Sequence, residues 1–186
     1  MGYSLTTLAK LPFDKDNEFY IFILGANANW KGGILESILK NFDYLAEQIG
    51  SNAIIAKGLK PREWTYEISQ KYFSDLDNIS ELFPGLLITN SHPDTFDNVS
   101  LRILVSLKQV EDNFANIEQF FNLLTDFISK KDDKFIEVAE KKITWIEKAN
   151  QTLELKPNFI GIGINFNKLI ELTYNKGKSP IIKNVD

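Results

Sequence analysis

FYIFILGANANWKGGILESILKNFDYLAEQIG, residues 19–50, is the stretch that decides the fold of this chain. It opens with an unbroken apolar run, Phe19 to Leu24, which is long enough for a buried strand and too short for a buried helix. After a glycine-rich loop, apolar residues recur at helical spacing from Ile34 to Ile49, and Gly50 stands where a helix commonly ends. The stretch therefore predicts a buried strand, a tight turn and one amphipathic helix.

The pattern continues downstream and gives the order of the elements. We expect a strand at residues 52–58, a helix that begins at Pro61, strands at 82–89 and 101–107, and a helix at about 113–130. A strand, a helix and a strand in succession imply a parallel pair, whereas two strands joined without a helix pair antiparallel. The predicted order is β-α-β-α-β-β-α, and it covers roughly residues 17–130.

The turn of the opening stretch resembles the active-site unit of thioredoxins. In that family the helix begins at Trp-Cys-Gly-Pro-Cys, and the same places here read Trp30-Lys31-Gly32-Gly33-Ile34. Pro84 opens a predicted strand and falls where thioredoxins carry a cis proline. The resemblance implies an α/β thioredoxin-like fold, a three-layer sandwich. Because both cysteines are replaced, it also implies a redox-inactive member of the family.

We predict one domain with an addition at its C-terminal end. Residues 1–18 are a lead-in with a short apolar stripe that Pro12 interrupts, and the thioredoxin-like domain spans residues 1–130. Residues 131–186 form an extension packed on the same domain, with a helix from Asp133 to about Asn150 and an alternating strand at 159–164. Residues 168–174 are either the hairpin partner of that strand or a short helix.

Composition argues against several classes of function. The chain of 186 residues has a net charge of −4, whereas nucleic-acid-binding proteins usually need a basic face. It has no cysteine, which excludes disulfides, thiolate catalysis and cysteine-ligated metals and fits a reducing, cytoplasmic location. No apolar run approaches the roughly 18 residues of a membrane span, so we expect no membrane association. We also expect no cofactor.

The candidate residues for a partner-binding groove are Trp30, Lys31, Gly32, Gly33, Phe83 and Pro84. Trp30 would be an aromatic anchor, and the free N–H groups of the two glycines would form an anion site that Lys31 completes. In thioredoxin-like proteins the backbone just before the proline pairs with an extended segment of the partner, and here that residue is Phe83. The alternatives are that Trp30 packs on the core and that Pro84 only begins a strand.

Other polar clusters have simpler explanations. His92, the single histidine, stands beside Ser91 and near Asp94, and a histidine can act as a general base. Adjacent residues rarely converge on one another, however, and a turn explains all three. A second cluster consists of Asp75, Asp77, Asn78 and Glu81. Its spacing is similar to that of a calcium-binding loop, but no glycine stands at the sixth place of the loop, so these residues are interpreted as a solvated helix boundary. We therefore predict no catalytic residue and no metal ligand.

These observations favour binding over catalysis. The expected function is that of a protein-interaction module or an adaptor subunit of a larger complex, whose partner is another protein or a second copy of the chain. The alternative is an enzyme that binds a nucleotide or glutathione. Glutathione transferases share the fold and need no cysteine, but they usually place a Ser or Tyr hydroxyl at the end of the first strand. This chain has Asn27, Asn29 and Trp30 there.

Overall fold

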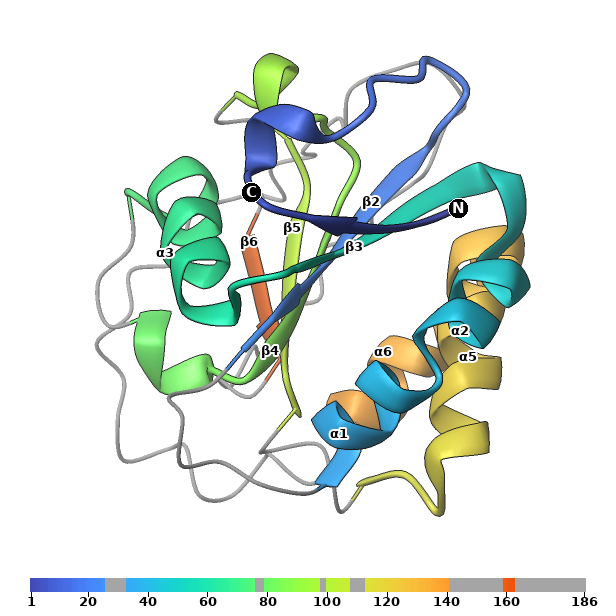
Figure 1. Ribbon diagram of the computed structural model, residues 1–186. Coiled ribbons are helices and arrows are strands. Elements are labelled where there is room, and N and C mark those ends of the chain that lie inside the picture. Colours follow the sequence, from blue (N-terminus) through green and yellow to red (C-terminus); the bar gives the residue numbers. More distant parts are fainter. Residues whose placement is uncertain (26–32, 76–78, 98–99, 108–112, 141–158, 163–186) are drawn as a thin grey trace, which may run out of the picture.

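The computed structural model describes residues 1–25, 33–75, 79–97, 100–107, 113–140 and 159–162 (Figure 1). In these residues a mixed β-sheet lies between two layers of helices, so the predicted α/β class is confirmed. The strand order is β1-β3-β2-β4-β5-β6. Each strand is parallel to its neighbours except β4, which is antiparallel to both β2 and β5.

β2 occupies the centre of the sheet, between β3 and β4, and its side chains are all buried. The predicted parallel pair β2–β3 and the predicted antiparallel pair β4–β5 are both confirmed. The strands are β1 (Gly2–Leu5), β2 (Phe19–Leu24), β3 (Ala53–Gly58), β4 (Gly85–Thr89), β5 (Arg102–Ser106) and β6 (Phe159–Ile162).

Different helices cover the two faces of the sheet (Figure 1). One layer consists of α1 (Gly33–Lys40), α2 (Phe42–Ile49), α5 (Ile117–Lys130) and α6 (Lys134–Glu140). The other consists of α3 (Pro61–Tyr72) with the short 3₁₀ helices η1 (Leu8–Lys10) and η3 (Ile79–Leu82). Along β2, Ile21 and Ile23 face the first layer, whereas Tyr20 and Phe22 face α3. Burial on both faces explains why β2 is a continuous apolar run.

The helix predicted from Ile34 to Ile49 is instead two helices, α1 and α2, which meet at Asn41. The Asn41 side-chain amide donates to the Ser37 carbonyl at 2.8 Å, and the Asn41 backbone N–H donates to the same oxygen at 3.0 Å. Local side-chain bonds of this kind compete with the helical ladder and bend helices. The predicted end of the helix at Gly50, which has a φ of 74°, is confirmed.

The predicted lead-in contains structure that its sequence does not indicate. Gly2–Leu5 forms the edge strand β1, parallel to β3, and residues 8–10 form η1. The Glu67 carboxylate of α3 accepts the Leu8 N–H at 2.9 Å and so holds η1 in place. Leu5 is the one buried residue of β1, so the strand has too little apolar alternation to be recognised in the sequence.

α5 begins at Ile117, four residues after Asn113, where the sequence predicts the start of this helix. The Asn116 side chain accepts the Gln119 N–H at 2.8 Å, and the Gln119 side chain returns a bond to the backbone ahead of the helix. These two bonds resemble a capping box, except that Gln119 accepts from the Ala115 N–H and not from that of the N-cap residue Asn116, and they fix the first turn at Ile117.

The predicted C-terminal extension falls partly within the described residues. α6 begins at Lys134, as expected, and residues 141–158 lie outside the described ranges. The predicted strand at 159–164 is described as β6 over residues 159–162, and it extends the sheet by pairing in parallel with β5. Residues 168–174, predicted as a hairpin partner or a short helix, lie outside the described residues.

Gly58, at the end of β3, makes room for Trp64 of α3. A Cβ added to Gly58 would lie 2.2 Å from the Trp64 Cβ, and the indole Nε1 is held by the Ile23 carbonyl at 3.1 Å. We expect Gly58→Ala to lower the free energy of unfolding by about 1–3 kcal/mol, because the anchored indole cannot move aside. Urea denaturation measures this loss. The exposed Ser51→Ala should change stability by less than about 0.5 kcal/mol, and equal effects would contradict the packing explanation.

Candidate functional site

Half of the predicted partner-binding groove lies in the described part of the chain. Trp30, Lys31 and Gly32 fall outside it, so their placement against Phe83 stays a prediction. Gly33 is exposed and opens α1 with a φ of 73°, a left-handed conformation that glycine adopts without strain. The glycine expected to permit the turn is therefore required by the backbone at this position.

Phe83 and Pro84 lead directly into β4. The strand predicted from Leu82 begins instead at Gly85, because Leu82 ends η3. The Phe83–Pro84 peptide bond is cis. Pro84 is buried, and its carbonyl oxygen accepts a hydrogen bond of 2.9 Å from the Leu107 N–H. Phe83 is half-buried and packs against the core on the α3 side.

The pairing of β2 with β4 brings the neighbouring chain segments together. Leu24 pairs with Gly85, so the chain that leaves β2 lies beside the chain that enters β4. The Gly25 N–H is held by Thr65 Oγ1 of α3 at 2.9 Å. Ser106 pairs with Gly85 from β5, is fully buried, and has no hydrogen-bond partner for its hydroxyl among the described residues.

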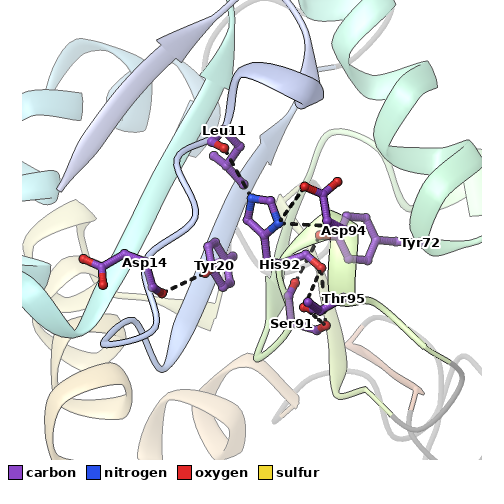
Figure 2. A network of polar contacts seen from close by, with 8 residues as sticks. All are labelled: Leu11, Asp14, Tyr20, Tyr72, Ser91, His92, Asp94 and Thr95. Carbon is purple, nitrogen blue, oxygen red and sulfur yellow. Dashed lines mark hydrogen bonds and ion pairs between the residues drawn. The ribbon is translucent and has the colours of Figure 1, made fainter.

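A buried polar network occupies the opposite end of β4 (Figure 2). His92 is 4% exposed; its Nδ1 accepts the Asp94 N–H at 3.2 Å, and its Nε2 lies 3.3 Å from the Leu11 carbonyl oxygen. Because Nδ1 is an acceptor, we assign the ring proton to Nε2, which donates it to Leu11. The Phe13 and Tyr20 rings make edge contacts with the imidazole, at centroid distances of 5.1 and 5.4 Å. His92 thereby fastens the lead-in to the loop after β4.

The network contains no nucleophile paired with a base. The Ser91 hydroxyl donates to the His92 carbonyl at 3.4 Å and lies 3.4 Å from Thr95 Oγ1, so it is directed away from the imidazole. The Asp94 carboxylate lies 3.7 Å from Nδ1 and is 84% exposed. His92 is the N-cap of the 3₁₀ helix η4 (Pro93–Thr95), which agrees with the turn interpretation of these residues.

Arg102, which sequence analysis does not single out, lies in the interior of the sheet. Its side chain is 1% exposed and donates to the Tyr72 carbonyl at 2.7 Å and to both carboxylate oxygens of Asp75 at 2.7 and 3.1 Å. Its guanidinium lies 5.6 Å from the centroid of the Phe96 ring. One charged residue inside an apolar run was the available signal, because a buried arginine needs a counter-charge.

Asp75 supplies that counter-charge instead of belonging to a metal loop. Both of its carboxylate oxygens are bonded to Arg102, so the interpretation of Asp75 as part of a solvated helix boundary is incomplete. Asp77 and Asn78 lie outside the described residues. Among the residues that are described, no group of three or more histidine and carboxylate side chains is placed to hold a metal ion.

Tyr72 links Arg102 to the histidine loop. Its carbonyl accepts from Arg102, and its hydroxyl donates to the Ser91 carbonyl at 3.1 Å. Burial of the ring raises the pKa of Tyr72 well above its ordinary value, with smaller contributions from Tyr20 and Asp94. The folded protein therefore keeps a neutral phenol where the unfolded chain has one that ionises near pH 10.

We expect stability to fall at alkaline pH because of the raised pKa of Tyr72. Below about pH 10 the phenol is neutral in both the folded and the unfolded state. Above about pH 10 only the unfolded state ionises, so the free energy of unfolding falls by about 1.4 kcal/mol per pH unit. Tyr72→Phe should remove this part of the slope and lose about 1 kcal/mol near neutral pH with the hydrogen bond to Ser91. Urea denaturation at several pH values gives both quantities. The exposed Tyr66→Phe should keep the wild-type slope, and an unchanged slope in Tyr72→Phe would contradict the assignment.

We expect the Arg102–Asp75 pair to contribute strongly to stability. Asp75→Asn removes the carboxylate charge that faces the buried guanidinium and should lower the free energy of unfolding by about 2–4 kcal/mol. This range allows for some solvent screening, because the Asp75 side chain is 25% exposed. Lys60 and Glu63 form a surface ion pair, so Glu63→Gln is the matched control and should cost less than about 1 kcal/mol. Similar losses in urea denaturation of the two variants would count against a special role for the buried pair.

Comparison with known proteins does not assign the chain to a family. A scan against protein-family models finds no match, and searches of curated proteins and of solved structures give no significant match either. Within the described ranges, none of the helices combines the length and the apolar character needed to cross a membrane. The functional interpretation therefore depends on the residues themselves.

Proposed function

We propose that this chain is a non-catalytic protein-interaction module or adaptor subunit, whose thioredoxin-like groove binds an extended segment of a partner protein. The succession β2, α1 and α2, β3, α3, β4, β5 and α5 supports such a fold, because thioredoxins have the element order β-α-β-α-β-β-α. A fold alone does not determine function. The proposal therefore depends on the residues at the start of β4.

The position of Phe83 is the observation that carries the proposal. Phe83 and Pro84 precede β4 beside the end of β2, which is where thioredoxin-like proteins pair their backbone with a partner segment. Phe83 packs against the α3-side core and is only partly buried. Aromatic side chains held in this way often carry much of the energy of an interface.

The chemistry of the chain also favours binding over turnover. The sequence has no cysteine, so thiol–disulfide exchange cannot occur. His92 bonds the Leu11 carbonyl and the Asp94 N–H, and Arg102 pairs with Asp75. These two polar side chains have structural partners and lie outside the proposed groove, whose own candidates are the aromatic rings of Trp30 and Phe83, the Lys31 cation and backbone groups.

Copurification followed by native mass spectrometry identifies the partner and its stoichiometry. We expect the double variant Trp30→Ala/Phe83→Ala to weaken binding of that partner about tenfold or more, because both aromatic anchors are removed. Calorimetric titration of the purified pair measures the change in affinity. Since Phe83 packs partly on the core, the double variant should also show a small decrease in melting temperature.

Tyr66→Ala is the matched control for this experiment. Tyr66 is 67% exposed on α3, so its removal deletes an accessible aromatic ring outside the proposed groove and should leave the affinity unchanged. Unchanged binding by the Trp30/Phe83 double variant would reject the groove. An increase in melting temperature with glutathione or a nucleotide, together with no partner, would instead favour a small-molecule-binding role.

A further inference from the structure

We propose that β1 pairs edge to edge with β1 of a second copy of this chain, so that two sheets join around a two-fold axis. β1 is the end strand in the order β1-β3-β2-β4-β5-β6, and Figure 1 shows it in dark blue beside β3. Its other edge is paired with no strand of the described residues. Because β3 and β2 separate β1 from β4, the contact does not depend on the proposed groove.

The backbone groups of β1 face β3 and solvent in turn. The Leu59 N–H donates to the Leu5 carbonyl at 2.8 Å, so the backbone groups of Leu5 face β3. These groups point to alternate sides along a strand, so those of Gly2 and Ser4 face away from β3. Both residues are exposed, and at that edge neither backbone bonds to another part of the described chain. β1 therefore presents two N–H groups and two carbonyls to solvent, spaced as in a β-ladder.

β1 lacks the features that usually keep an exposed edge strand from pairing. Natural edge strands often carry lysine, proline or a β-bulge, each of which opposes the addition of another strand. The sequence of β1, Gly2-Tyr-Ser-Leu5, contains neither a charged residue nor a proline, and its register with β3 runs without a bulge. Two copies of such an edge can approach without like charges facing each other along the ladder.

The exposed groups of β1 are complementary to themselves, which selects a second copy as the occupant. In an antiparallel pair, two residues that lie opposite each other exchange both of their hydrogen bonds. Gly2 of each copy does so with Ser4 of the other, which gives four hydrogen bonds related by the two-fold axis. Tyr3 then lies opposite Tyr3 of the second copy. It is half-buried against the α3-side core, and cross-strand aromatic pairs of this kind stabilise a ladder.

β1 is held in a position from which it can pair. A Cβ added to Gly2 would lie 2.6 Å from the Ala46 Cβ, so α2 packs directly against the start of the strand, and Leu5 is buried at its end. A strand that is already ordered loses little conformational entropy when another strand is added. The contact is short, however, because β1 has four residues. It buries much less than the roughly 1,200 Å² of a standard interface, so we expect a dissociation constant of about 0.1 mM.

The antiparallel contact orients the two copies in opposite directions. The start of β4 in one copy then lies toward the opposite edge of the joined sheet from the start of β4 in the other. For the function proposed above, on which this consequence alone depends, the dimer carries two Phe83 grooves that open at opposite ends. Such a dimer binds two partner segments at once, and a partner with two segments gains affinity only where its linker spans both grooves.

Sedimentation equilibrium of the full chain tests the pairing. Between about 10 µM and about 1 mM, the weight-average mass should rise from near that of one chain toward that of two. Hydrogen exchange locates the contact. Over the same range the protection of the Ser4 N–H should rise about two- to fivefold, because this donor becomes bonded in the dimer, whereas that of the Tyr3 N–H, which faces β3, should change less. A chain that stays monomeric up to about 1 mM overturns the proposal.

Three substitutions at Ser4 separate edge pairing from other kinds of association. Ser4→Pro removes the outward N–H, and an edge strand tolerates proline at such a position, so β1 stays paired with β3. Ser4→Lys keeps the N–H but adds a charge to the edge of each copy. Both should raise the dissociation constant at least about tenfold, whereas the neutral Ser4→Ala, which keeps the N–H, should associate like the wild-type chain.

The comparison of Ser4→Lys with Ser4→Ala decides the question even if Ser4→Pro does not fold. Association that is unchanged in Ser4→Lys would show that another surface joins the copies and would overturn the proposal. Equal loss of association in Ser4→Ala would also overturn it, because the backbone and not the Ser4 hydroxyl makes the proposed bonds.

Discussion

The burial of β2 on both faces is the constraint on which the rest of the structure depends. Its six side chains alternate between two separate cores, and its backbone is paired with β3 on one side and β4 on the other. Every side-chain direction of the strand is thus used for packing. Polar side chains are therefore placed where strands begin and end: Arg102 begins β5, and His92 follows β4.

At the His92 end, buried polar groups are stabilised by being joined to one another. Arg102 bonds the Tyr72 carbonyl, and the Tyr72 hydroxyl bonds the Ser91 carbonyl next to His92. Each group would be costly to bury alone, and each partner removes part of that cost. The network joins β5, α3 and the loop after β4. It therefore fixes the positions of three elements that are far apart in the sequence.

Apolar periodicity predicted the elements that bury side chains at regular intervals, because burial leaves a pattern in the sequence. This applies to β2, α3 and α5. Periodicity did not reveal β1, in which Leu5 alone is buried, or the break at Asn41, where the side chain also bonds the Ser37 carbonyl. Phe83 and Pro84 could be identified as site candidates because a proline at a strand start is a local feature. The partnership of Arg102 with Asp75 could not, because it forms only when α3 closes on β5.

The two ends of β4 should act independently even though one strand joins them. Coupling between distant sites requires an element with two discrete arrangements that both sites bias. β4 is paired with β2 and with β5 along residues 85–89, and all five of its residues are buried, so it has no second arrangement at low cost. Residues 7–13 lie outside this pairing and are bonded to the rest of the fold through Leu8 to Glu67 and Leu11 to His92. Phe83 and His92 therefore stand at opposite ends of a strand that is too firmly paired to transmit a change from one to the other.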